Sequence, residues 1–195
     1  MTSERAMYVL AFAASPRRGG NTDTLLDHVL EGARAEGADV ERIIVAQHRI
    51  APCIECNGCW KEGICVVQDD FQLLYPKLEV AERIILATPM FFGHVSAQAK
   101  QLIDRCQCFY ARKYIVHRPM PPVPHPRKGY LVAAAGHPRI KFDCMGLTMR
   151  VWMDALDATY DGALTFNSLE DAGDAASRPD ILEQARQFGR RIVVP

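Results

Sequence analysis

The chain has 195 residues, of which 49% are hydrophobic and 24% charged, a composition typical of one folded domain and unlike that of disordered or fibrous proteins. Its 23 basic and 23 acidic residues cancel, so no excess charge attracts nucleic acid or an anionic membrane. No apolar run approaches the ~20 residues of a membrane span, and residues 1–7 lack the pattern of a signal peptide. We therefore expect one soluble, cytoplasmic domain, residues 1–195, without nucleic-acid or membrane partners.

Cysteine content is the unusual feature of the composition. The chain has seven cysteines, and four of them lie between positions 53 and 65. An odd number with this clustering does not resemble an extracellular disulfide framework. In a reducing compartment such a cluster indicates a metal or redox site.

The first third of the chain predicts two strands around a helix. Residues 6–13 are an apolar run, typical of a strand buried on both faces. Residues 24–37 have an apolar stripe at helical spacing and end in glycine. Residues 40–45 predict a second strand, and the Cys-rich loop that follows, residues 46–66, has no sustained period.

The remainder alternates helices and strands around one Pro-rich arm, residues 117–128, which predicts an extended connection. Pro76 is expected to bend or shorten the first of these helices. The predicted helices are 70–79, 96–108, 145–158 and 179–191, and the predicted strands are 83–88, 129–135 and 160–166.

Strands that alternate with helices and lack polar alternation predict an α/β fold with helices on both faces of a parallel sheet. With right-handed crossovers, five strands suit the doubly wound order 2-1-3-4-5. Ligands of such sheets bind outside the carboxyl ends of the strands. That rule nominates three loops as the ligand site, residues 14–22, 88–96 and 135–139.

The first loop, ASPRRGGNT, is a candidate phosphate site because it joins a buried strand to a helix N-terminus, where free N–H groups favour an anion. It has neither the dinucleotide nor the Walker pattern. A Gly-rich turn with a capping Asn is the alternative interpretation. The candidate donors are Ser15, Arg17, Arg18, Asn21 and Thr22.

The second loop suits a flat ring. Pro89 extends the backbone, Gly93 allows close approach, and Phe91 and Phe92 provide apolar surface. Core packing of either Phe is the alternative. The third loop is less informative. His137 is as consistent with a solvent-exposed loop residue as with a residue that contacts the ligand.

Together, ASPRRGGNTDTLL, TPMFFGHVSAQAKQLIDR and the cysteine cluster resemble the NAD(P)H-dependent FMN reductase group of flavodoxin-like proteins, and within it the iron–sulfur flavoproteins. The resemblance covers residues 7–136, with Ala14 standing where the family commonly has Gly. It implies that the FMN phosphate is bound by Ser15, Arg17, Asn21 and Thr22. It also implies that the ring and ribityl chain are lined by Pro89, Met90, Phe91, Phe92 and Gly93.

Further residues complete these motifs. We include Ser96 and Gly136 among the candidate cofactor residues. For Lys100, Asp104 and Arg105, the resemblance implies packing and subunit contact.

The cysteines follow the pattern Cys53-x2-Cys56-x2-Cys59-x5-Cys65, whose first three members have the spacing of bacterial ferredoxins. Resemblance to the iron–sulfur flavoproteins implies that all four ligate a [4Fe–4S] cluster that passes single electrons to FMN. A zinc site is an alternative, although it usually has two x2 pairs separated by a longer spacer. A loop of free thiols or an occasional disulfide is another.

The remaining cysteines are predicted to be structural. Cys106 and Cys108 fall on different faces of a predicted helix. With Cys144 they are expected to be buried or partly buried thiols.

The preferred function is an FMN-dependent oxidoreductase that passes electrons between NAD(P)H or ferredoxin and a small-molecule or protein acceptor. No catalytic side chain is required, because the cofactor carries the redox chemistry. The alternatives are a cluster-free NAD(P)H-dependent FMN or quinone reductase and a non-catalytic flavodoxin-like carrier. From the family we expect a homodimer or a dimer of dimers, with the Pro-rich arm reaching a neighbour.

Overall fold

A computed structural model describes residues 5–194, so part of the N-terminal segment and the last residue lie outside the described part. Its centre is a five-stranded sheet in which every pair of neighbours is parallel. The order β2-β1-β3-β4-β5 confirms the doubly wound, flavodoxin-like prediction. The strands are β1 (Tyr8–Ala13), β2 (Asp39–Ile44), β3 (Arg83–Pro89), β4 (Lys128–Ala134) and β5 (Thr159–Phe166).

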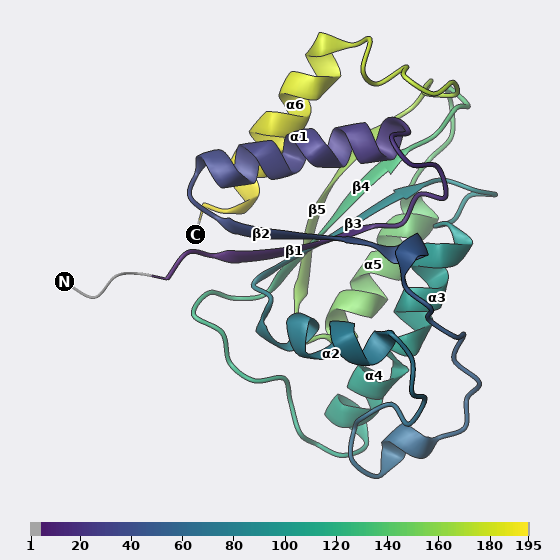
Figure 1. Ribbon diagram of the computed structural model, residues 1–195, viewed down its shortest axis with the longest axis vertical. Helices are drawn as coiled ribbons and strands as arrows, with labels where there is room; N and C mark the ends of the chain where they lie inside the picture. The colour runs from purple at the N-terminus through teal and green to yellow at the C-terminus, as the bar shows by residue number, and fades with distance from the viewer. Residues whose placement is uncertain (1–4, 195) are drawn as a thin grey trace.

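Helices cover both faces of the sheet (Figure 1). One face carries α1 (Asn21–Ala35) and α6 (Pro179–Ile192), which lie above the sheet in Figure 1. The other face carries α2 (Phe71–Val80), α3 (Ala97–Arg105), α4 (Gln107–Tyr114) and α5 (Asp143–Ala155). Two short 3-10 turns, Val45–Gln47 and Gly58–Trp60, flank and interrupt the Cys-rich loop.

The two hydrophobic cores follow from this layering. Successive side chains of a strand point to opposite faces. In β1, Leu10 and Phe12 therefore pack toward α2–α5, while Val9 and Ala11 pack toward α1 and α6. All four are fully buried. This burial on both faces explains why the strands read as continuous apolar runs.

The predicted helix 96–108 is wrong in its extent. The chain forms α3 up to Arg105, turns at Cys106, and continues as α4 to Tyr114. At the turn the Cys106 N–H binds the Ile103 carbonyl at 2.9 Å, and the two helices pack separately against the core. Most of α4 was therefore not predicted from the sequence.

The Pro-rich arm has no helix or strand from residue 117 to 127, and it is anchored to the body of its own chain. The Met120 N–H donates to the Asp157 carboxylate at 2.7 Å. The His125 ring and the Glu82 carboxylate lie 2.7 Å apart. These contacts explain how a proline-rich segment stays ordered without backbone ladders.

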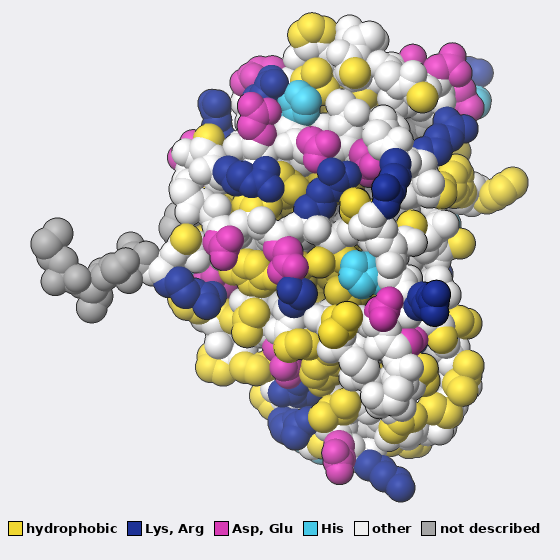
Figure 2. Space-filling view, in the orientation of Figure 1, with side chains coloured by type: hydrophobic (Ala, Val, Ile, Leu, Met, Phe, Trp, Pro, Cys, Tyr) yellow, Lys and Arg dark blue, Asp and Glu magenta, His cyan; other side chains and the backbone are white. Residues whose placement is uncertain are grey.

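The surface mixes charges of both signs. Arg42 pairs with Asp23 at 3.2 Å and with Asp27 at 2.7 Å. Figure 2 shows acidic and basic side chains intermixed around α1 and β2, and more apolar surface around α2. Among residues 5–194, no helix combines the length and apolar character needed to cross a membrane.

Candidate functional site: a cavity at the carboxyl end of the sheet and a cysteine loop

A cavity of about 200 Å³ opens beyond the carboxyl ends of β1, β3 and β4. All three nominated loops contribute to it. Of the predicted cofactor residues, the lining contains Ser15, Arg17, Asn21, Thr22, Pro89, Met90, Phe91 and Gly136. Arg18, Phe92, Gly93 and Ser96 are not part of that lining.

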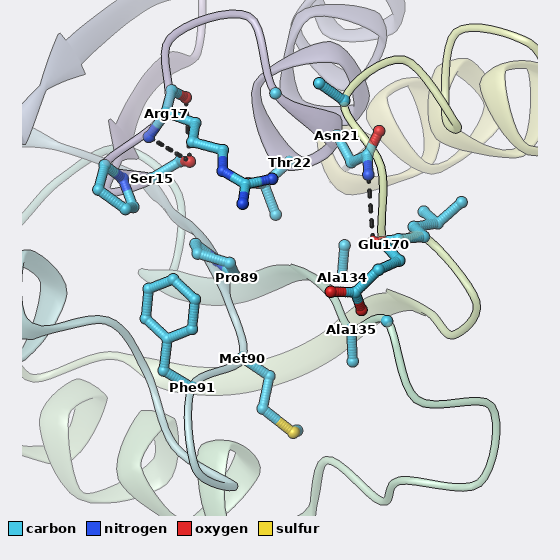
Figure 3. A pocket seen from close by; sticks show the side chains of 15 residues that line it. Ser15, Arg17, Asn21, Thr22, Pro89, Met90, Phe91, Ala134, Ala135 and Glu170 are labelled. Atoms are coloured by element: carbon cyan, nitrogen blue, oxygen red, sulfur yellow. Dashed lines mark hydrogen bonds between the residues drawn. The ribbon is translucent and has the colours of Figure 1, made fainter.

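The phosphate-type end of the cavity is built by the turn after β1. The Ser15 hydroxyl donates to the Arg17 carbonyl at 3.0 Å and accepts from the Arg17 N–H at 3.2 Å, which holds the turn closed. Gly20 caps α1 without a side-chain hydrogen bond, so the N–H groups of the first turn have no side-chain partner. The Arg17 guanidinium points into the cavity (Figure 3). This end can therefore receive an anion.

A buried carboxylate braces the same turn. Asp23, in the first turn of α1, accepts from the Gly19 N–H at 2.9 Å and pairs with Arg42. Its negative charge is thus neutralised by local partners. No pattern in the sequence marked Asp23 for this role.

Asn21 has a role that its loop position did not predict. Its amide nitrogen donates to the carbonyls of Leu169 and Asp171 at 3.1 and 2.9 Å, and its oxygen accepts from the Ala175 N–H at 3.0 Å. The side chain is therefore occupied in tying the segment after β5 to the start of α1. This tie brings Leu169, Glu170 and Ala172 into the lining, and no sequence signal marked them.

Glu170 lies across Gly136. A Cβ atom at Gly136 would stand 1.4 Å from a carboxylate oxygen of Glu170, so a side chain at position 136 would displace the Glu170 carboxylate. Figure 3 shows the Glu170 carboxylate pointing into the cavity on the side opposite Phe91.

The loop after β3 forms a tight turn. The backbones of Phe91 and His94 exchange two hydrogen bonds of 2.9 Å. The two residues between them, Phe92 and Gly93, have φ values of 50° and 79°, a left-handed pair that defines a type I′ turn. The Phe92 side chain is fully exposed, whereas Phe91 lines the cavity. Neither packs in the core.

Ser96 lies beneath the cavity. It is fully buried, and its hydroxyl caps α3 by accepting from the Ala99 N–H at 3.2 Å. The same hydroxyl donates to the Ala14 carbonyl at 2.6 Å. Its contacts thus support the two loops from below.

The Cys-rich loop forms a second cavity, of about 30 Å³, on the side of α3 and α4. Its lining includes Cys53, Cys56, Cys59, Cys65 and, from α4, Cys108. Burial, together with negative charge on the three neighbouring loop cysteines, raises the pKa of Cys59. The four loop cysteines therefore line one cavity.

The four loop cysteines are of the right chemical type to bind a metal group, but their side chains are not arranged around a common metal position. Four thiols around one cavity are the ligands of iron–sulfur or tetrahedral zinc sites. Within residues 5–194, however, no three His, Cys, Asp or Glu side chains are arranged to hold a metal ion. All seven thiols are free.

The three other cysteines differ in exposure. Cys106 and Cys108 are buried, as predicted, and burial raises the pKa of the Cys106 thiol to about 12. Cys144 is exposed, so the prediction of a buried or partly buried thiol is wrong there. It lies in the first turn of α5, where the apolar stripe faces the other way.

Comparison with known proteins agrees with this architecture. The family model for NADPH-dependent FMN reductase matches residues 7–150, well over half of the chain. An iron–sulfur flavoprotein of Methanocaldococcus jannaschii is 42% identical over 99 residues, which is 51% of this chain and 51% of that protein. The chain thus spans about half the length of the curated relatives it matches.

Solved structures show the same fold. An NAD(P)H:quinone oxidoreductase from Methanothermobacter marburgensis superposes with a TM-score of 0.73 over 96% of this chain and 100% of the other, at 18% identity. An archaeal flavodoxin superposes with a TM-score of 0.56 over 96% of both chains, at 13% identity.

The fold and the cavity at the carboxyl end of its sheet define a flavodoxin-like protein. The chain belongs to the family described as NADPH-dependent FMN reductase. Within that family it is similar to proteins named iron–sulfur flavoproteins.

Proposed function

We propose that this chain is an FMN-dependent oxidoreductase whose cavity binds the flavin. We also propose that residues 1–195 form a single domain, in which the Cys-rich loop and the Pro-rich arm are insertions. The observation that carries the proposal is the cavity itself. It joins a helix N-terminus that has no side-chain cap, and an inward-pointing Arg17, to the apolar side chains of Pro89, Met90 and Phe91. Those are the two chemistries that a flavin phosphate and a flavin ring require.

Different residues along the cavity would bind the phosphate and the ring of the flavin. The first turn of α1 and Arg17 would hold the phosphate, with Ser15 keeping the turn closed. Pro89 to Phe91 would line the ring. When bound, FMN supplies the redox chemistry, accepting a hydride as an electron pair and releasing electrons singly. The chain binds and orients it.

Arg17 and Arg18 provide a matched test of the phosphate site, since they are adjacent arginines and only Arg17 lines the cavity. A charged hydrogen bond contributes about 1.5–3 kcal/mol, so Arg17→Ala should weaken FMN binding by roughly ten- to a hundredfold. Arg18→Ala should bind FMN almost as the wild type does. Fluorescence titration of the iron-free protein with FMN measures both. Equal losses in the two variants would contradict the assignment.

We further propose that Cys53, Cys56, Cys59 and Cys65 hold a [4Fe–4S] cluster. The support is their shared cavity and the similarity to iron–sulfur flavoproteins. An absorption spectrum of protein purified without oxygen, with iron and sulfide analysis, tests both cofactors. We expect a flavin spectrum, a shoulder near ~400 nm, and about four iron and four sulfide per chain.

Each other result has a defined meaning. Flavin without iron would leave the FMN site standing and make the cysteines thiols. One zinc per chain without sulfide would indicate the tetrahedral alternative. No flavin after FMN is added would overturn the central proposal.

The reaction is proposed as electron transfer from NAD(P)H or ferredoxin to an acceptor. Residues 5–194 fold around one five-stranded sheet, and NAD(P)H would stack on the flavin near Phe91. Sustained NADH or NADPH oxidation with a quinone or free FMN as acceptor is expected. Stoichiometric reduction without turnover would instead identify an electron carrier.

We also propose that two copies pair through a groove between α3–α4 and α5. This groove of about 350 Å³ is mainly apolar, and Leu147 and Val151 on its α5 side are exposed by 59% and 65%. A face of this kind is typical of subunit contact. Sedimentation velocity should show a dimer, or a dimer of dimers, that Val151→Glu dissociates. A wild-type monomer would contradict the pairing.

A further inference from the structure

Arg105, the last residue of α3, is a buried cation whose hydrogen-bond partners all lie on the segment that carries the cysteines. Its side chain is 1% exposed. One terminal nitrogen donates to the Ala51 carbonyl at 2.9 Å and to the Asp69 carboxylate. The other donates to the Cys65 sulfur at 3.3 Å and to the Val67 carbonyl at 3.4 Å. One guanidinium therefore joins the two ends of the loop.

The position of this guanidinium is itself fixed. It stacks over the Phe71 ring, 4.9 Å from the ring centre. Its partner Asp69 also accepts from the backbone N–H groups of Ala51 and Phe71, at 2.8 and 3.0 Å. Arg105 and Asp69 thus form a rigid base under a loop that has no helix or strand from residue 51 to 57.

We propose that Arg105 is the positioning residue of the cysteine site. It clamps the loop on α3 and directs an N–H group at the sulfur of Cys65. This inference rests on the proposed function, in which the four loop cysteines hold an iron–sulfur cluster. Hydrogen bonds to cluster sulfurs and nearby positive charge favour the reduced, more negative state. Arg105 should therefore make the reduction potential of the site less negative.

The planar fork of arginine is essential to this role. It reaches acceptors on both sides at once, whereas a lysine ammonium is a single point charge on a flexible stem. Arg105→Lys keeps the charge and loses the fork, and Arg105→Gln loses both.

Arg83 offers a matched control. It is also 1% exposed, but it donates only to backbone carbonyls, those of Glu82, Pro126 and Ile192. None of these lies in the Cys-rich loop. Arg83→Gln therefore removes a buried arginine of the same kind without touching the cysteine site.

The first experiment uses the protein purified or reconstituted with iron and sulfide in the absence of oxygen. Loss of iron to a chelator and the cluster midpoint potential, followed by EPR, are measured for all four proteins. Arg105→Gln should hold iron on the order of tenfold less tightly and have a more negative potential. Arg105→Lys should lie between it and the wild type. Arg83→Gln should match the wild type in both, even if it unfolds more readily.

Unchanged potential and iron retention in Arg105→Gln would overturn the proposal, as would the same changes in Arg83→Gln. A second measurement separates this failure from failure of the proposed cluster. Hydrogen exchange of residues 52–66 in the iron-free protein should be faster in Arg105→Gln than in either the wild type or Arg83→Gln. A wild type that never takes up iron would overturn the cluster and the effect on potential. Equal exchange rates would overturn the clamp.

Discussion

The hydroxyl of Ser96 donates a hydrogen bond of 2.6 Å to the carbonyl oxygen of Ala14. Ala14 directly follows β1, and Ser96 lies at the end of the loop after β3. The Ser96 N–H also donates to the Thr88 hydroxyl at 3.0 Å. One buried residue therefore sets the relative position of two loops that line the cavity.

Ser96→Ala should destabilise the fold and weaken FMN binding together. The change removes the cap of α3 and leaves the Ala14 carbonyl unpaired, which should lower the free energy of unfolding by about 1–2 kcal/mol. Urea unfolding and FMN titration measure the two effects. The exposed Ser177, whose hydroxyl bonds only locally to Asp174, is the control. An Ser96→Ala variant as stable as Ser177→Ala would contradict the bracing role.

Helices α1 and α6 touch at two glycines. A Cβ atom at Gly32 would lie 2.1 Å from the Arg186 carbonyl oxygen, and one at Gly189 would lie 1.9 Å from that of Val29. Gly32→Ala should therefore lower the free energy of unfolding by about 1–3 kcal/mol, because the backbones must separate.

Gly146 in α5 is the matched control for that substitution. A Cβ atom there meets nothing closer than 3.9 Å. Gly146→Ala should leave stability unchanged or raise it by up to about 1 kcal/mol through better helix propensity. Equal effects of the two substitutions in urea unfolding would show that the close contact between α1 and α6 is unimportant.

We expect Glu82 to make the free energy of unfolding depend on pH in the acid range. Burial alone would raise its pKa, but hydrogen bonds from the Tyr8 N–H and from His125 outweigh burial and lower it below the usual range. Because the folded-state pKa is the lower one, the stabilisation is present above the unfolded-state value of about 4.3. It is lost as the pH falls through the folded-state pKa.

Glu82→Gln should accordingly be less stable than the wild type at pH 7 and lose less stability on acidification. Urea unfolding at pH 7 and at several values from 5 down to 3 gives the comparison. Glu36→Gln, at an exposed position at the end of α1, should follow the wild-type curve. A Glu82→Gln curve parallel to the wild type would contradict the linkage.

The thiols should differ sharply in reactivity, since the thiolate is the nucleophile. Burial raises the pKa of Cys106 to about 12 and that of Cys108 well above its usual range. Cys144 is exposed. In the folded protein at pH 8, iodoacetamide should label Cys144 and leave Cys106 and Cys108 unmodified. Peptide mass spectrometry reads the sites, and urea should expose all seven. Labelling of Cys106 as fast as Cys144 would be the contrary result.

Much of the fold could be predicted from local patterns of apolar residues in the sequence. The continuous apolar runs of β1, β3 and β4 occur because helices bury both faces of a parallel sheet. Once the strands and intervening helices are placed, handed crossovers leave few topologies. The sheet rule then pointed to the loops after β1, β3 and β4, and residues of all three line the cavity.

The sequence by itself determined the order of strands and helices, the ligand edge of the sheet and the cysteine spacing, because each depends on residues close together in the chain. Only the tertiary structure decided which polar groups meet. Asn21 bonds to residues about 150 positions away, and Arg105 bonds to Cys65 across 40. Such contacts depend on how the helices pack on the sheet, and no local pattern in the sequence specifies that packing. The same packing divides α3 from α4 at Cys106, brings Glu170 over Gly136, and leaves Arg17 rather than Arg18 in the cavity.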